Sequence, residues 1–144
     1  IPDDDETSIV HGDYRLDNMI LKNNQVMGIL DWELSTLGHP IADFSYHCLS
    51  WRTQEAFWNQ AKLKELGIPS EKEYMDMYCE NTGKDLSKNW EFYMAFNMFK
   101  IAGILQGILG RVRDGTASSK HAEDRGMMVY PLSEAAWNTI KENF

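Results

Sequence analysis

Two short apolar runs joined by Asn23-Asn24 restrict the fold of this chain more than any other feature. Residues 19–22 and 25–30 each have the length of a strand, and asparagine tolerates the positive φ that a tight turn requires. The sequence therefore predicts a β-hairpin. Such a hairpin places Asn18, where the first strand begins, close in space to Asp31, where the second strand ends.

Helical patterns follow the hairpin along the rest of the chain. Pro40 suits the first turn of a helix, Ser70 can cap the start of another, and Gly83 can end it. Pro131 indicates a kink or a break. Besides a short strand over residues 8–10, we expect helices over about residues 40–49, 54–66, 71–81, 87–113 and, as one or two helices, 118–144. The predicted fold class is therefore α+β and mostly helical.

The helix expected over residues 87–113 is apolar nearly all round, so we expect it to be the central buried helix. Its longest apolar run, residues 94–109, is interrupted by Asn97, Lys100 and Gln106. For this reason we expect no membrane span, and no signal-peptide pattern is expected either.

Charge and cysteine content restrict the partners and the compartment. The chain has 144 residues, which suits one domain, and a formal net charge of −8 from 22 acidic and 14 basic side chains. This charge repels a nucleic-acid backbone, so no nucleic-acid partner is expected, whereas Mg²⁺ can bridge carboxylates to the phosphates of a nucleotide. Cys48 and Cys79 lie in apolar helical stretches and are expected to be free thiols, as in a reducing cytoplasm.

A polar motif precedes the hairpin, His11-Gly12-Asp13-Tyr14-Arg15-Leu16-Asp17-Asn18, and Asp31-Trp32-Glu33 follows it. The spacing His-x-Asp-x-x-x-x-Asn is that of a kinase catalytic loop, in which Asp accepts the proton of the substrate hydroxyl and Asn binds Mg²⁺. The ten residues before His11 contain neither a lysine nor a glycine-rich loop. The sequence therefore has the features of one half of an active site.

These motifs carry a family resemblance. The pattern His-Gly-Asp-x-x-x-x-Asn, then Leu30-Asp31-Trp32-Glu33 and Gly38-His39-Pro40, resembles the aminoglycoside phosphotransferase (choline kinase-like) family of the protein-kinase-like superfamily. Residues 30–40 and 99–107 are similar to a subgroup of kinase-like domains associated with acyl-CoA dehydrogenases. The resemblance implies that residues 1–144 form the C-terminal lobe of a kinase-like domain, and that the N-terminal lobe, which grips ATP, is missing.

The resemblance also implies the reacting groups. Asp13 would be the catalytic base, and Asn18 and Asp31 would bind Mg²⁺ and, through it, the phosphates of ATP. Arg15 would neutralise the γ-phosphate, at a position where protein kinases often have a lysine. The alternatives are a turn-stabilising Asp13, a hairpin cap at Asn18 and a solvent-exposed Arg15.

Three further residues would support the site. His11 would pack and hydrogen-bond to the backbone, and Asp43 would brace the catalytic loop through backbone amides, although it can also be an ordinary first-turn helix aspartate. Glu33 would share a face with Asp31 on an extended segment, where it would bind metal through water or form a salt bridge.

The activity implied is ATP- and Mg²⁺-dependent phosphotransfer to a hydroxyl group of a small molecule. A hydroxyacyl-CoA-type metabolite is preferred to an aminoglycoside as the acceptor. Without an N-terminal lobe, this chain alone is expected to be weakly active or inactive. The alternatives are a non-catalytic kinase-like interaction module and a metal-dependent hydrolase that uses His11, Asp13, Asp31 and His39.

Overall fold

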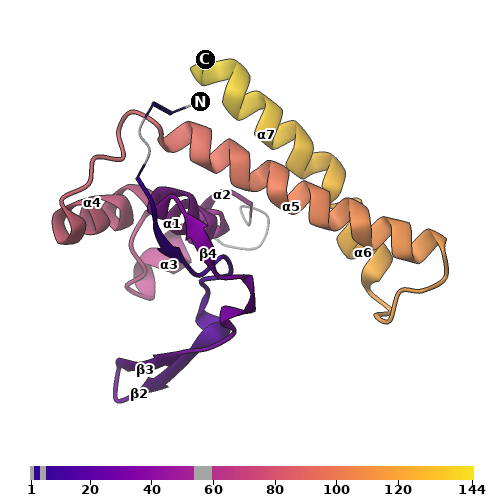
Figure 1. Ribbon diagram of the computed structural model, residues 1–144, viewed down its shortest axis with the longest axis horizontal. Coiled ribbons are helices and arrows are strands. Elements are labelled where there is room, and N and C mark those ends of the chain that lie inside the picture. The colour runs from indigo at the N-terminus through magenta and orange to yellow at the C-terminus, as the bar shows by residue number, and fades with distance from the viewer. Residues whose placement is uncertain (1, 4–5, 54–59) are drawn as a thin grey trace. The chain divides into compact units, whose positions relative to one another are not determined.

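The computed structural model describes residues 2–3, 6–53 and 60–144. The chain forms two compact units, residues 1–90 and residues 91–144. Figure 1 shows strands and helices in the first unit and helices in the second unit. The predicted α+β, mostly helical fold class is confirmed, and each unit is described by itself below.

The predicted hairpin is present in the first unit. Strands β2 (Met19–Lys22) and β3 (Gln25–Ile29) pair antiparallel, with Lys22 opposite Gln25. Asn23 and Asn24 both have positive φ, 52° and 59°, which is the backbone of a type I′ turn. The register shifts between Ile20 and Leu21, so the hairpin carries a bulge.

A second strand pair closes the segment that carries the motifs. Strand β1 (Ser8–Val10), which the sequence predicted, pairs antiparallel with β4 (Thr36–Gly38), which it did not. The three-residue β4 ends in glycine and has no strand pattern of its own, and it is defined by its partner. Because Val10 pairs with Thr36, the two ends of residues 11–35 are held together.

The described part of the first unit continues with the helices α1 (Pro40–Cys48), α2 (Ser50–Thr53), α3 (Gln60–Glu65) and α4 (Glu71–Thr82). Pro40 is the first residue of α1, as predicted. Ser70 and Glu73 form a capping box at the start of α4, and Gly83 ends this helix with φ 72°. Of the helix expected over residues 54–66, residues 54–59 lie outside the described part of the chain.

Aromatic rings and an ion pair join α1 and α2 to α4. Phe44 of α1 stacks on Tyr78 of α4 with ring centroids 3.8 Å apart. Arg52 donates to both carboxylate oxygens of Glu71, and Trp90 Nε1 donates to Glu71 Oε1 at 2.7 Å. Cys48 is buried and free, and Cys79 is half-buried and free, so the expected free thiols are confirmed.

The second unit consists of α5 (Trp90–Arg113, whose first residue belongs to the first unit), α6 (Ala122–Met127) and α7 (Val129–Asn143). Helix α5 begins about three residues later than predicted, because residues 87–89 form a turn in which Ser87 N donates to Asp85 Oδ1. Pro131 produces no kink, because it lies in the first turn of α7, where its missing N–H is not needed. The break between α6 and α7 is at Met128.

The expectation that α5 is the central buried helix is wrong for part of its surface. Met94 and Met98 are buried, whereas Phe96, Phe99 and Ile104 are 47%, 75% and 53% exposed. A helix with apolar side chains on every side needs neighbours on every side, and this unit supplies two further helices. Among the helices in the described ranges, α5 is the one that is long and apolar enough to cross a membrane. The absence of a membrane span stays a prediction.

Candidate active site

The turn at Gly12 requires glycine. Its φ is 82°, and a Cβ at this position would lie 2.7 Å from the carbonyl oxygen of Leu34. Leu34 ends a 3₁₀ turn, Trp32–Leu34, that directly follows Asp31. The missing side chain of Gly12 therefore lets the loop of the first motif approach the segment of the second motif.

The side-chain carboxylate of Asp43, in the first turn of α1, binds backbone amides of the turn at Gly12. Its Oδ2 accepts a hydrogen bond from His11 N at 2.8 Å, and its Oδ1 accepts one from Gly12 N, also at 2.8 Å. Two amide donors on one carboxylate form charge-assisted hydrogen bonds. This is the contact expected of a residue that braces the loop.

His11 is 3% exposed and uses both ring nitrogens. Nε2 lies 2.8 Å from the carbonyl oxygen of Leu30 and donates to it, and Nδ1 accepts from Asp13 N at 3.2 Å. The neutral ring with its proton on Nε2 satisfies both contacts. The ring also packs against Trp32, with centroids 4.7 Å apart. The buried ring of His11 thus connects Asp13 of the first motif to Leu30 and Trp32 of the second.

Asp13 has a hydrogen-bond donor on each carboxylate oxygen. Asn18 Nδ2 donates to Asp13 Oδ2 at 3.0 Å and to the Asp13 carbonyl oxygen at 2.9 Å. The hydroxyl of Tyr46 donates to Asp13 Oδ1 at 2.9 Å. Burial, followed by this bond to Asp13, raises the pKa of Tyr46 to about 12, so the phenol keeps its proton at neutral pH. The carboxylate is fixed by two donors from different parts of the chain.

Asn18 and Asp31 are brought close, as the hairpin predicted. Leu30 N donates to the carbonyl oxygen of Asn18 at 2.8 Å, so the residue before Asp31 is hydrogen-bonded to Asn18. Asp31 has left-handed backbone angles, φ 63° and ψ 54°, and its exposed carboxylate makes no capping bond to the turn that follows. Asn18 donates to Asp13 through Nδ2, so its other polar side-chain atom, Oδ1, is the one that can bind a metal ion. An amide oxygen and a carboxylate are hard ligands that suit Mg²⁺.

Glu33 does not share an extended segment with Asp31, so that expectation is wrong. The left-handed backbone of Asp31 and the 3₁₀ turn Trp32–Leu34 replace the extended chain, because the segment folds back toward Gly12. Glu33 is exposed. Binding of a metal ion by Glu33 through a water molecule stays a prediction.

Arg15 pairs with its neighbour Asp17, to which Nε donates at 3.0 Å. The two side chains are 55% and 72% exposed. The hydrogen bond to Asp17 is the main cause that raises the pKa of Arg15, and the charge of Asp13 contributes less. In this structure Arg15 is therefore held at the outer side of the loop, and its contact with a phosphate stays a prediction.

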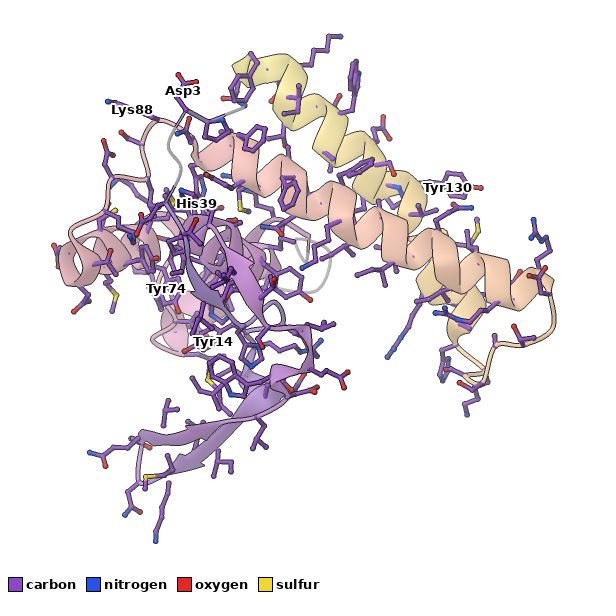
Figure 2. All side chains as sticks on the ribbon, viewed as in Figure 1. Asp3, Tyr14, His39, Tyr74, Lys88 and Tyr130 are labelled. Atoms are coloured by element: carbon purple, nitrogen blue, oxygen red, sulfur yellow. The ribbon has the colours of Figure 1, made fainter. Side chains whose placement is uncertain are left out.

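Two residues of α1 that sequence reasoning did not select complete the site. Besides Tyr46, His47 contacts the loop: its Nδ1 lies 3.0 Å from the carbonyl oxygen of Tyr14 and donates to it. Tyr14 is labelled in Figure 2, and its ring meets that of His47 edge to face. Asp43, Tyr46 and His47 are spaced i, i+3, i+4, so they lie on one face of α1. That spacing from Asp43 was the available sequence signal.

The metal-hydrolase alternative receives no support from this geometry. Within the described ranges, no group of three or more His, Cys, Asp or Glu side chains is arranged to hold a metal ion. The ring of His39 caps α1, because its Nδ1 accepts from Ile41 N at 3.2 Å, and both nitrogens of His11 are used within the loop. A hydrolytic site built on these histidines would need both to be released.

Comparison with known proteins settles the family. Residues 1–78, more than half of the chain, match the phosphotransferase enzyme family, APH. The chain belongs to this family. The Asp13–Asn18 loop and the hairpin after it lie within the matched residues.

Relatives of this phosphotransferase-family chain include two acyl-CoA dehydrogenase family members. The chain is 43% identical to member 10 from Mus musculus over 152 residues, and 38% identical to member 11 from Homo sapiens over 151 residues. Each alignment covers 100% of this chain, but only 14% of the mouse protein and 19% of the human one. The predicted resemblance to kinase-like domains associated with acyl-CoA dehydrogenases is confirmed.

A solved structure supports the same assignment. A protein from Ralstonia eutropha JMP134, provisionally named an aminoglycoside phosphotransferase, matches with a TM-score of 0.86 and 50% sequence identity. The match covers 96% of this chain and 44% of that protein. The predicted kinase-like fold is therefore confirmed, and this chain corresponds to less than half of its structural relative.

Proposed function

We propose that this chain carries the catalytic loop of an ATP- and Mg²⁺-dependent kinase that phosphorylates a hydroxyl group of a small molecule. The observation that carries the proposal is the arrangement around Asp13. Its carboxylate is held by Asn18, and Asn18 is hydrogen-bonded through its backbone to the residue before Asp31. A base and two hard-oxygen ligands on adjoining segments are what phosphoryl transfer needs from a protein.

In this mechanism Asp13 accepts a hydrogen bond from the acceptor hydroxyl and orients its oxygen toward the γ-phosphorus. As the new O–P bond forms, Asp13 takes up the hydroxyl proton, the bond between the γ-phosphorus and the β–γ bridging oxygen breaks, and ADP leaves. Each oxygen of Asp13 has a second lone pair for this task, because one donor occupies each. Asn18 Oδ1 and the Asp31 carboxylate would hold Mg²⁺. When bound, this ion neutralises the charge of the phosphate oxygens. Arg15, after leaving Asp17, would add a positive charge beside the transferred group.

We further propose that residues 1–144 act as the C-terminal lobe, and that ATP is also gripped by an N-terminal lobe outside this chain. The support for this proposal is that the match covers 44% of the solved relative. For the acceptor we propose a hydroxyacyl-CoA-type metabolite in preference to an aminoglycoside. The support is the similarity to acyl-CoA dehydrogenase family members, at 38–43% identity.

The test is ATP turnover by the protein together with the residues that precede this chain, compared with the chain alone. Hydroxyacyl-CoA thioesters and aminoglycosides are offered as acceptors, with and without Mg²⁺. We expect Mg²⁺-dependent phosphorylation of a hydroxyacyl-CoA by the longer protein and little or none by this chain alone. Phosphorylation of aminoglycosides alone would contradict the acceptor proposal. Absence of any turnover or nucleotide binding would indicate a non-catalytic module.

A further inference from the structure

We propose that Tyr46 is a positioning residue that fixes the carboxylate of Asp13 for proton transfer; this inference rests on the proposed kinase function. The family match and the catalytic motif do not by themselves give Tyr46 a role. The evidence for its role is the hydrogen bond from the Tyr46 hydroxyl to Asp13 Oδ1, which is 2.9 Å long and joins residues 33 positions apart in the sequence.

The two donors to the Asp13 carboxylate come from different elements of the fold. Asn18 holds Oδ2 from within the loop itself, so any movement of the loop carries Asn18 and Asp13 together. Tyr46 holds Oδ1 from α1, a separate element. With a donor on each oxygen, the carboxylate cannot rotate about its Cβ–Cγ bond without loss of both hydrogen bonds. Tyr46 therefore relates the base to a fixed part of the fold.

The neighbours of Tyr46 on α1 make this reference point rigid. Asp43, one turn earlier, accepts from the amides of His11 and Gly12, before Asp13. His47 donates to the carbonyl oxygen of Tyr14, after Asp13. One face of α1 is thus hydrogen-bonded to the loop backbone on both sides of Asp13. Tyr46 lies on that face and is hydrogen-bonded to the side chain of Asp13. Orientation of this kind, when set before the substrate binds, accelerates the chemical step.

Tyr46 acts as a donor and not as an acid or base. It is half-buried, and its pKa is raised to about 12 by burial and by its bond to Asp13. The phenol therefore remains protonated across the pH range in which a kinase works. Its hydroxyl can only orient the carboxylate, so its removal should affect the rate more than substrate binding.

The test compares Tyr46→Phe with Tyr74→Phe in the full protein with its preceding residues. Both changes remove one hydroxyl from a half-buried ring in the same unit. Tyr74, labelled in Figure 2, packs its ring against Phe44, His47 and Trp51, whereas the side-chain donors to the Asp13 carboxylate are Asn18 and Tyr46. We expect Tyr46→Phe to lower kcat about tenfold or more while the KM for ATP stays within about twofold, as loss of a positioning contact does. Tyr74→Phe should leave kcat unchanged. Equal kcat values in wild type and Tyr46→Phe would overturn the inference.

A double-mutant cycle separates positioning from a general structural effect. If Tyr46 acts through the carboxylate, Tyr46→Phe should cause no further loss of kcat in an Asp13→Asn background. An undiminished loss in that background would contradict the inference. A wild-type protein without any turnover would overturn the proposed function itself, whereas an active protein that is insensitive to Tyr46→Phe overturns this inference alone.

A second readout is independent of catalysis. The titration of Tyr46 is followed by NMR of the labelled phenol carbon, with Tyr46→Phe used for assignment. In Asp13→Asn the pKa of Tyr46 should fall below its value of about 12 in the wild type and stay above about 10, because burial remains while the partner charge is gone. An unchanged titration would show that Tyr46 does not sense the carboxylate and would overturn the inference.

Discussion

A Cβ at Gly12 would lie 2.7 Å from the carbonyl oxygen of Leu34, so the two motif segments meet where a side chain is missing. Gly12 also has a φ of 82°, which favours glycine. We therefore predict that Gly12→Ala lowers the free energy of unfolding by about 2 kcal/mol or more, from backbone strain plus the clash with Leu34. Chemical denaturation measures this change, and ATP turnover should fall with it.

Gly83 provides the control for this prediction. It ends α4 with a φ of 72°, but a Cβ there would meet no atom within 4 Å. Gly83→Ala should therefore cost only the strain, about 1 kcal/mol, and leave turnover unaffected. Equal effects of the two substitutions on stability and on turnover would contradict the role assigned to the Gly12–Leu34 approach.

Asp43→Asn should loosen the loop. His11 N and Gly12 N bind separate oxygens of Asp43, so in asparagine one of these two donors would face the NH2 group, which is itself a donor, and the side chain would carry no charge. We expect a loss of about 1–3 kcal/mol in the free energy of unfolding, because a partly buried donor loses its charged acceptor. Hydrogen exchange at the His11 and Gly12 amides should become faster. Unchanged exchange at both amides would argue against this bracing contact.

Because of His47, we predict that the free energy of unfolding decreases at acidic pH. Burial is the main cause that lowers the pKa of His47 below its ordinary value of about 6.5, and its bond to Tyr14 opposes this effect in part. Below that ordinary value the unfolded chain binds a proton more readily than the folded one. The contribution of His47 is therefore present above about pH 6.5 and is lost as the pH falls through the lowered folded value.

The matched variant for this measurement is His47→Asn, whose side-chain amide can still donate to the carbonyl oxygen of Tyr14 but does not titrate in this range. The free energy of unfolding is measured in denaturant at pH 8, 7, 6 and 5. The difference between wild type and variant should shift in favour of the variant as the pH falls. A difference that is constant with pH would show that His47 does not carry the effect.

Elements with local signals were predictable from the sequence. The hairpin follows from Asn23-Asn24 between two apolar runs, and α4 follows from Ser70, Glu73 and Gly83, because turn and cap chemistry act over a few residues. Strand β4 was not predictable, since three residues ending in glycine become a strand only by pairing with Ser8–Val10. Exposure of Phe99 was missed because apolar composition does not reveal how many neighbours a helix has.

The candidate site divides in the same way. Asp13, Asn18 and Asp31 could be selected because their spacing along one loop and one hairpin is itself the signal. Tyr46 and His47 were missed because their contacts depend on how α1 packs against a loop more than thirty residues earlier. The turn of Asp31 into left-handed backbone could not be read from the sequence either, and it moved Glu33 from the expected face.

The most direct test of the account is the turnover of ATP by Asp13→Asn in the full protein with its preceding residues. Asp76→Asn serves as control, since Asp76 is an exposed carboxylate on α4 paired with Lys72. We expect kcat of Asp13→Asn to fall about a hundredfold or more, as for loss of a general base, while nucleotide binding persists and Asp76→Asn matches the wild type. Turnover by Asp13→Asn equal to that of the wild type would contradict the assignment of Asp13 as the base.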